Sequence, residues 1–259
     1  HLLNKSHPKY KDLDARISRT SLTICQADSL SAQERPEKEV ALEEGEWKSN
    51  VPLVSIFSRV RLGKLEVGEN SEQKLDEKRL RYCPPGYVSD VIPYPQENIT
   101  ISREDYKRCF KAFEEDFLQI KECLTPDNLL VLLEKHTSFI PSETRIVKGK
   151  IESYPDVSLF DHLKLTAAIA ISIDLYLEDN YPEKYKKNDL LADEIQDMED
   201  KKFLLIGGDF SGVQDFIYTI SSKGALKTLR ARSFFLDILT EHIISQFLEE
   251  ASLPRANII

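Results

Sequence analysis

The sequence predicts an α+β fold in which long helices are separated by short strands. Apolar residues recur at helical spacing over residues 14–35, 102–117 and 158–177, a pattern typical of amphipathic helices. Residues 52–100 hold short runs rich in β-branched and aromatic residues, interrupted by Gly and Pro, which favours a small, mostly β insert. Residues 203–218 pass from an apolar run through two glycines into an apolar-periodic segment, the pattern of a strand, a tight turn and a helix.

The first predicted helix covers residues 14–35 and ends before Pro36, which interrupts a helix. Residues 36–50 are acidic and polar, so we expect a solvated connector there. The β-rich part that follows contains three candidate strands, at residues 53–60, 79–82 and 87–92. A helical part and a β-rich part are therefore expected to meet near residue 50.

Two later helices are predicted to begin with a capping box. In this motif a serine and an acidic residue three positions on satisfy each other's backbone N–H groups. The first box pairs Ser102 with Asp105, and the second pairs Ser158 with Asp161. We therefore expect helices that begin directly after Ser102 and Ser158.

The remaining segments are assigned from their composition. Residues 127–136 are expected to form a further helix, and residues 141–155 a loop. Residues 178–202 are rich in charge, which predicts a mobile loop before the strand at 203–206. The chain closes at residues 256–259 on an apolar run that resembles a strand without its partner, and it opens in mid-pattern, so we expect a fragment of a longer protein.

Composition narrows the classes of function. The chain has 259 residues, 41% of them hydrophobic, which is enough for two domains or parts of three. Its net charge of −9 does not fit a generally basic nucleic-acid binder, so any nucleic-acid contact must come from local patches. The sequence has no signal peptide and no apolar run of bilayer-spanning length, which predicts a cytoplasmic location. The cysteines lack C-x-x-C spacing, which favours free thiols in a reducing compartment over zinc ligands: Cys25, Cys83, Cys109 and Cys123.

The end of the predicted strand at 203–206 is the first candidate binding site. Gly207, Gly208 and Asp209 follow the strand directly. Glycines let a backbone approach a ligand closely, and the N-terminus of a helix favours anions. The pattern is neither a P-loop nor a dinucleotide fingerprint, so by itself it predicts only a site for a phosphate-bearing ligand.

The amino-acid sequences of four separated stretches resemble one known family. Residues 208–239, GDFSGVQDFIYTISSKGALKTLRARSFFLDIL, resemble the opening of the first Palm domain in the large subunit of type III CRISPR effector complexes. ADSLSAQER at 27–35 is similar to the end of that family's HD domain, and SYPDVSLFDHLKLTAAIA at 153–170 to the segment leading into the first Palm. PLVSIFSRVRL at 52–62 looks like the start of the linker domain of the III-A branch.

The resemblance implies a division of the chain into three parts. Residues 1–50 would be the C-terminal helices of a helical HD domain, and residues 51–135 a linker domain that is β-rich and then helical. Residues 136–259 would be an incomplete first Palm domain with a ferredoxin-like fold. The chain would then be an N-terminal fragment of the III-A subunit.

For Asp28, the resemblance implies the last ligand of the HD metal site. The metal would be Mn, Ni, Co or Mg, and would activate water against a phosphodiester. The other ligands are expected upstream, and a purely structural Asp28 stays open as the alternative. The Asp161-His162 pair has the reverse order of an HD pair, so we interpret it as structural, and we interpret His136 and His242 as ordinary histidines.

A nucleotide site is implied at the start of the Palm, with ATP as substrate. The resemblance places the metal-binding GGDD hairpin in the second Palm, outside this chain, so the first Palm would lend backbone amides and a hydroxyl. For Asp209 a second role stays open, as the cap of the following helix. The implied nucleotide-binding residues are Gly208, Asp209, Phe210, Ser211 and Gly212.

A basic run follows the predicted nucleotide site. It contains four cationic residues and no acidic residue, so its local charge is positive although the protein as a whole is acidic. It would bind a triphosphate or the guide-RNA backbone, and the alternative is a solvated helix face. The four residues are Lys223, Lys227, Arg230 and Arg232.

The resemblance implies an enzyme subunit of antiviral defence. In the intact protein, target RNA would activate HD-domain cleavage of single-stranded DNA and synthesis of cyclic oligoadenylate from ATP between two Palms, whereas this fragment alone would be inactive. Expected partners are guide RNA, target RNA, single-stranded DNA, the small subunit and the subunit holding the guide 5′ end, with no membrane. One alternative is a non-catalytic scaffold that anchors guide RNA and neighbouring subunits. Another is a stand-alone nucleotide cyclase, against which the stretches at 27–35 and 55–62 argue.

Overall fold

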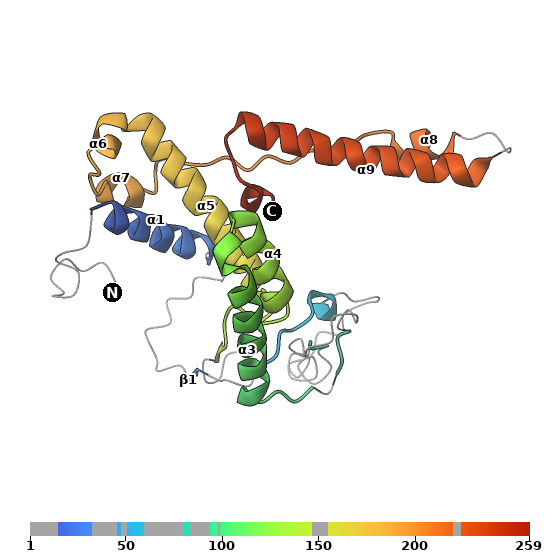
Figure 1. Ribbon diagram of the computed structural model, residues 1–259, viewed down its shortest axis with the longest axis horizontal. Helices are drawn as coiled ribbons and strands as arrows, with labels where there is room; N and C mark the ends of the chain where they lie inside the picture. Colours follow the sequence, from blue (N-terminus) through green and yellow to red (C-terminus); the bar gives the residue numbers. More distant parts are fainter. Residues whose placement is uncertain are drawn as a thin grey trace, which may run out of the picture.

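The structure, a computed structural model, describes most of the chain and is largely helical (Figure 1). The described residues are 15–32, 46–47, 51–59, 80–82, 94–97, 99–146, 155–219 and 224–259. The predicted α+β fold is therefore shown only in part, because the sheet among these residues has just two short strands.

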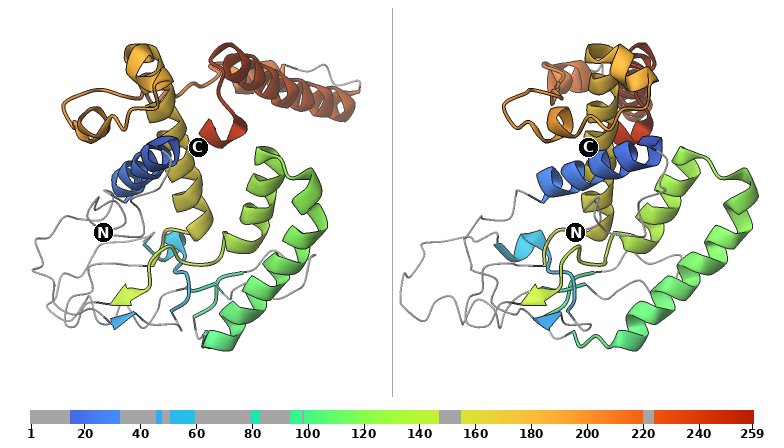
Figure 2. Two further views of the ribbon diagram at one scale, coloured as in Figure 1. Left: turned by 60° about the vertical axis from the view of Figure 1, so that its left-hand side comes forward. Right: turned by 90° about the vertical axis from the view of Figure 1, so that its left-hand side faces the viewer.

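Helix α5 (Leu159–Asn180) is the element around which the others are arranged. It contacts α1 (Ala15–Ser31), α4 (Pro126–Thr137) and the 3₁₀ turn η4 (Arg255–Asn257). Helix α3 (Arg103–Ile120) forms an antiparallel hairpin with α4, as both views of Figure 2 show. The three predicted long helices at 14–35, 102–117 and 158–177 are thus confirmed, with α1 ending at Ser31.

The capping box predicted at Ser102 is present, whereas at Ser158 the serine caps the helix without the reciprocal bond from its own backbone N–H. The carboxylate of Asp105 accepts the backbone N–H of Ser102 at 2.8 Å and its hydroxyl at 2.6 Å. At the start of α5, the hydroxyl oxygen of Ser158 accepts the N–H of Asp161 at 3.0 Å, and the hydroxyl donates to Asp161 Oδ2 at 2.7 Å. Because these bonds satisfy N–H groups that have no partner within the helix, they fix where α3 and α5 begin.

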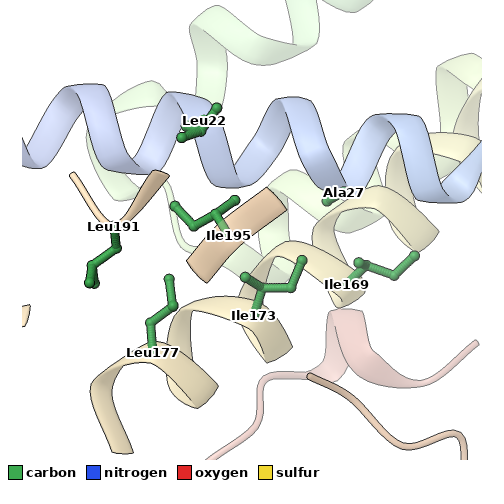
Figure 3. Close-up of a cluster of buried hydrophobic side chains, with 7 residues drawn as sticks. All are labelled: Leu22, Ala27, Ile169, Ile173, Leu177, Leu191 and Ile195. Carbon is green, nitrogen blue, oxygen red and sulfur yellow. The ribbon is translucent and has the colours of Figure 1, made fainter. Parts of the chain in front are cut away.

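The hydrophobic core lies between α1, α5 and the short helix α7 (Ala192–Gln196) (Figure 3). The side chains of Ile173, Leu177 and Ile195 are fully buried there. Burial of a Leu or Ile side chain stabilises a fold by about 1.5–3 kcal/mol. The cluster consists of Leu22, Ala27, Ile169, Ile173, Leu177, Leu191 and Ile195.

The prediction of a mobile loop at 178–202 is wrong. The segment contains α6 (Pro182–Lys186) and α7, and its Leu191 and Ile195 belong to the core. Charge predominates in the segment, but these two apolar side chains have a nonpolar surface to pack against once α1 lies on α5. Their burial outweighs the polar character of their neighbours.

The predicted β-rich insert forms isolated antiparallel bridges where the structure describes it. Val54 pairs with Arg81, and Arg81 pairs with Gln96. The candidate strand at 53–60 is interrupted by the 3₁₀ helix η2 (Ile56–Arg59). The hydroxyl of Ser58 accepts the N–H of Leu80 at 3.0 Å, so a side chain replaces the backbone partner and the ladder ends. The candidate strand at 87–92 lies outside the described residues.

A short sheet joins two segments that were expected to be irregular. β1 (Glu46–Trp47) pairs antiparallel with β2 (Arg145–Ile146). Part of the predicted connector at 36–50 therefore pairs with part of the predicted loop at 141–155. The pairing supplies hydrogen-bond partners for backbone N–H and C=O groups of both segments.

The apolar run at 203–206 is not a strand, which corrects the prediction. These residues are exposed, Leu204 by 81%, and form no ladder with any part of the chain that the structure describes. A strand requires a neighbour for its N–H and C=O groups. The expected strand at 256–259 instead overlaps η4, where Asn257 Nδ2 donates to Ala168 O at 3.1 Å and to Ser172 Oγ at 3.3 Å. Two of the strands expected for a ferredoxin-like unit are thus not formed within the described residues.

Candidate functional site

Asp28 and His162 lie together although 134 positions separate them in the sequence. Nε2 of His162 is 2.9 Å from Oδ1 of Asp28. The His162 side chain is 12% exposed and the Asp28 side chain 61%. Since a carboxylate can only accept, Nε2 carries the hydrogen of this bond.

Two hydroxyl groups extend the contact between α1 and α5. Oγ of Ser31 lies within hydrogen-bond distance of three atoms: Nδ1 of His162 at 3.3 Å, Oγ1 of Thr166 at 2.8 Å and Asp28 O at 2.9 Å. Asp28 and Ser31 are three residues apart on α1, and His162 and Thr166 are four apart on α5, so each pair shares one helix face. Both ring nitrogens of His162 therefore have a partner on α1.

This donor set does not fit a metal site by itself. Within the described ranges no group of three or more His, Cys, Asp or Glu side chains could hold a metal ion. Asp28 and His162 supply two donors, and these are hydrogen-bonded to each other. The predicted ligand Asp28 keeps Oδ2 without a hydrogen bond to any described residue.

The bend at 207–212 is open. A side chain added at Gly207, Gly208 or Gly212 would meet nothing within 4 Å. Gly212 has φ +76°, which favours glycine. Phe210 and Ser211 of the same bend are exposed. The backbone of the predicted nucleotide site is therefore accessible.

The alternative role of Asp209 as a helix cap is not observed. Helix α8 (Val213–Tyr218) begins after Gly212 and has no side chain bonded to its N-terminus. Asp209 forms no side-chain hydrogen bond with any residue that the structure describes, so its carboxylate lies free on the bend.

The predicted basic run divides into different environments. Lys223 lies outside the described residues. Lys227 and Arg230 are exposed on α9 (Ala225–Glu250) and form no ion pair with a described residue. The side chain of Arg232 donates to Phe216 O and, at 2.8 Å, to Thr219 O, and its guanidinium lies 5.2 Å from the centroid of the Phe216 ring. Arg232 therefore caps the C-terminus of α8 and binds α8 to α9.

The other histidines and cysteines that the structure describes have simple environments. His136 is buried, and its Nε2 lies 2.8 Å from Oδ2 of Asp116, which holds α3 on α4. His242 is exposed. Cys25, Cys109 and Cys123 form no disulfide with one another; Cys83 lies outside the described residues.

Three curated relatives each match more than four fifths of the chain. Each is described as a CRISPR system single-strand-specific deoxyribonuclease Cas10/Csm1 of subtype III-A. The protein of Methanocaldococcus jannaschii is 36% identical over 98% of this chain, that of Mycobacterium tuberculosis 36% over 82%, and that of Thermococcus onnurineus 33% over 91%. A family model described as Csm1 subunit domain B matches residues 202–259.

A solved structure agrees with these matches. It is titled a crystal structure of the Csm1–Csm4 cassette in complex with cA4, and its similar chain is 25% identical with a TM-score of 0.55 over 91% of this chain. The chain belongs to the Cas10/Csm1 family. The resemblance drawn from the four sequence stretches is thereby confirmed.

The chain spans only part of its Cas10/Csm1 relatives. It covers 32%, 24% and 25% of the three curated proteins and 25% of the solved chain. Among the described residues, no helix has both the length and the apolar character needed to cross a membrane. The three predicted domains and the two boundaries between them stay predictions.

Sequence reasoning missed the role of His162. The reversed order of the Asp161-His162 pair predicts a structural role, but it does not indicate that His162 contacts Asp28. The usable signal was a pair of polar residues at helical spacing on each of two helices: Asp28 and Ser31, then His162 and Thr166. Nothing in a single sequence shows that these two faces meet.

Proposed function

We propose that this chain is part of the large subunit of a type III-A CRISPR effector complex whose intact form has two activities. One is cleavage of single-stranded DNA, and the other is synthesis of cyclic oligoadenylate from ATP, both switched on by target RNA. The observation that carries the proposal is the match over 98% of this chain to a relative described as a single-strand-specific deoxyribonuclease. The match to a chain solved with cA4 supports the second activity.

For DNA cleavage, we propose that Asp28 supplies one carboxylate to a divalent metal site. Its side chain is 61% exposed and its Oδ2 is free of described partners. Carboxylate and imidazole ligands together suit Mn, Ni, Co or Mg. The described residues do not complete such a site, so the remaining ligands would have to come from elsewhere in the intact protein.

For oligoadenylate synthesis, we propose that the open bend at 207–212 contacts ATP through its backbone and the hydroxyl of Ser211. The absence of a side chain at Gly208 leaves room for a phosphate to approach, since nothing lies within 4 Å of the position of a Cβ. Lys227 and Arg230, exposed on α9, would meet phosphate groups of ATP or of guide RNA.

A scaffold without catalysis is the second candidate function. It is favoured by the Asp28–His162 contact, which gives Asp28 a structural role at 2.9 Å. In that case the protein would anchor guide RNA, the small subunit and the subunit holding the guide 5′ end. Its cytoplasmic location stays a prediction.

One experiment separates the two candidates. The full-length complex is incubated with ATP, Mg²⁺, target RNA and labelled single-stranded DNA, and both products are measured. We expect Asp28→Ala to lower DNA cleavage by at least a hundredfold and to leave oligoadenylate synthesis near the wild-type rate, whereas Asp116→Ala, on the distant α3, serves as the matched control. If the wild-type complex forms neither product, the scaffold is the correct function.

A further inference from the structure

The contact between His162 and Asp28 joins two helices to which the sequence resemblance gives different roles. Helix α1 carries the stretch that resembles the end of an HD domain, and α5 belongs to the stretch that leads into a Palm. The two helices pack along their apolar faces through Leu22, Ala27, Ile169 and Ile173 (Figure 3). Apolar packing alone is nondirectional and does not fix one helix against sliding along the other.

The polar contacts at the end of α1 are directional and can fix its position along α5. His162 is 12% exposed and is held at both nitrogens, by Asp28 Oδ1 at 2.9 Å and by Ser31 Oγ at 3.3 Å. Thr166 adds a bond of 2.8 Å to Ser31. Hydrogen bonds have a narrow range of length and angle, so this set is satisfied at one register of α1 on α5.

We propose that His162 is a positioning residue that fixes the Asp28 carboxylate and, with Ser31 and Thr166, locks the end of α1 onto α5 without any metal ion. The lock orients Asp28 so that Oδ1 faces α5 and Oδ2 stays available. The importance of this lock for a nuclease rests on the proposed function of Asp28. The hydrogen bonds that form the lock do not depend on that function.

The independence from metal follows from the donor set. The two potential metal ligands that the described residues bring together, Asp28 and His162, are already hydrogen-bonded to each other. A histidine that donates its N–H to a carboxylate holds that carboxylate in place, as outer partners of ligating groups do in many proteins. Asp28 is thus held from α5 before any ligand arrives.

Hydrogen–deuterium exchange of the full-length protein, without DNA or ATP and with EDTA present, measures the lock directly. Exchange of amides in the last turn of α1, residues 28–32, reports local opening. His162→Phe removes both ring nitrogens at similar volume, and we expect these amides to exchange about three to ten times faster, the range for one partly exposed hydrogen-bonded pair. His162→Gln keeps an N–H donor that can reach Asp28, so protection should return to within about twofold of wild type.

Two further variants test that the residues act as a pair. Asp28→Ala should also accelerate exchange, and the double variant should not exceed His162→Phe, because the bond between Asp28 and His162 is lost in all three. The matched control is His136→Phe at the other Asp–His pair, with Asp116. This control variant should accelerate amide exchange in α3 and α4 but not in residues 28–32.

Three outcomes would overturn the proposal. The first is an exchange rate of residues 28–32 that is unchanged in His162→Phe. The second is a double variant whose increase in exchange rate equals the product of the increases in the two single variants. The third is protection of these amides that appears only when Mn²⁺ replaces EDTA. Because no substrate is present in this measurement, its failure leaves the proposed activities untouched. Loss of those activities would likewise leave the lock standing.

Discussion

The guanidinium carbon of Arg19 lies 3.9 Å from the centroid of the Tyr185 ring. Arg19 is 3% exposed and also donates to the carbonyl oxygens of Tyr185 at 3.1 Å and Asp189 at 3.4 Å. The hydroxyl of Tyr185 donates in turn to Asp174 Oδ2 at 2.9 Å. A single buried cation on α1 thus holds the segment after α5 against the body of the protein.

We expect Arg19→Met to open the segment around α6 and α7. The variant fills the volume but leaves the carbonyls of Tyr185 and Asp189 without their donor, at a cost of about 1–3 kcal/mol, and loses the cation–π contact, worth about 0.5–2 kcal/mol. Limited proteolysis of the full-length protein should then cut within residues 182–200 at least tenfold faster. Arg16→Met, on the exposed side of α1, is the control; equal cleavage in both variants would contradict the role of Arg19.

The start of α3 should depend on pH in the acidic range. The hydroxyl of Ser102, then its N–H and then Arg108 lower the pKa of Asp105 from 3.8 to about 2. A carboxyl group whose folded pKa is depressed adds stability that is complete above its ordinary pKa and is lost as pH falls through the folded value. The first turn of α3 should therefore lose protection between about pH 4 and pH 2.

Amide exchange over residues 103–107, corrected for the intrinsic pH dependence of exchange, checks this. In Asp105→Asn the extra pH dependence should disappear, while Glu104→Gln, at an exposed neighbouring site, should keep it. A pH dependence that survives in Asp105→Asn would show that another group causes it.

Local chemistry could be predicted from the sequence, whereas long-range pairing could not. The capping residues Ser102 and Ser158 were found because their partners lie three positions away. Leu191 and Ile195 were missed because their burial depends on α1, which lies far away in the chain. The strand at 203–206 was predicted from its apolar run, but a strand exists only with a neighbour. For the same reason His162 could not be assigned to Asp28.

The nucleotide proposal predicts that Gly208→Ala affects synthesis but not structure. A Cβ at this position meets nothing within 4 Å, and Gly208 does not have a positive φ. We expect unchanged exchange of α8 and α9, with oligoadenylate synthesis at least tenfold lower because the methyl group would occupy the space of the phosphate. Gly212→Ala also changes a residue with φ +76° and should destabilise the bend by about 1 kcal/mol. Normal synthesis in Gly208→Ala would show that ATP does not approach the bend.

Variants of Arg230 and Arg232 should distinguish a residue that binds a ligand from one that stabilises the fold. Arg232 binds the end of α8 through Thr219 O at 2.8 Å, so Arg232→Ala should accelerate exchange of α8, about tenfold for the loss of a charged hydrogen bond. Arg230 is exposed and has no ion pair with a described residue, so Arg230→Ala should leave exchange unchanged. If Arg230 contacts a phosphate of guide RNA, Arg230→Ala also lowers the salt dependence of RNA binding by about one unit of slope. Measured binding between 50 and 200 mM salt decides this, because an unchanged slope would assign Arg230 to the solvated face of α9.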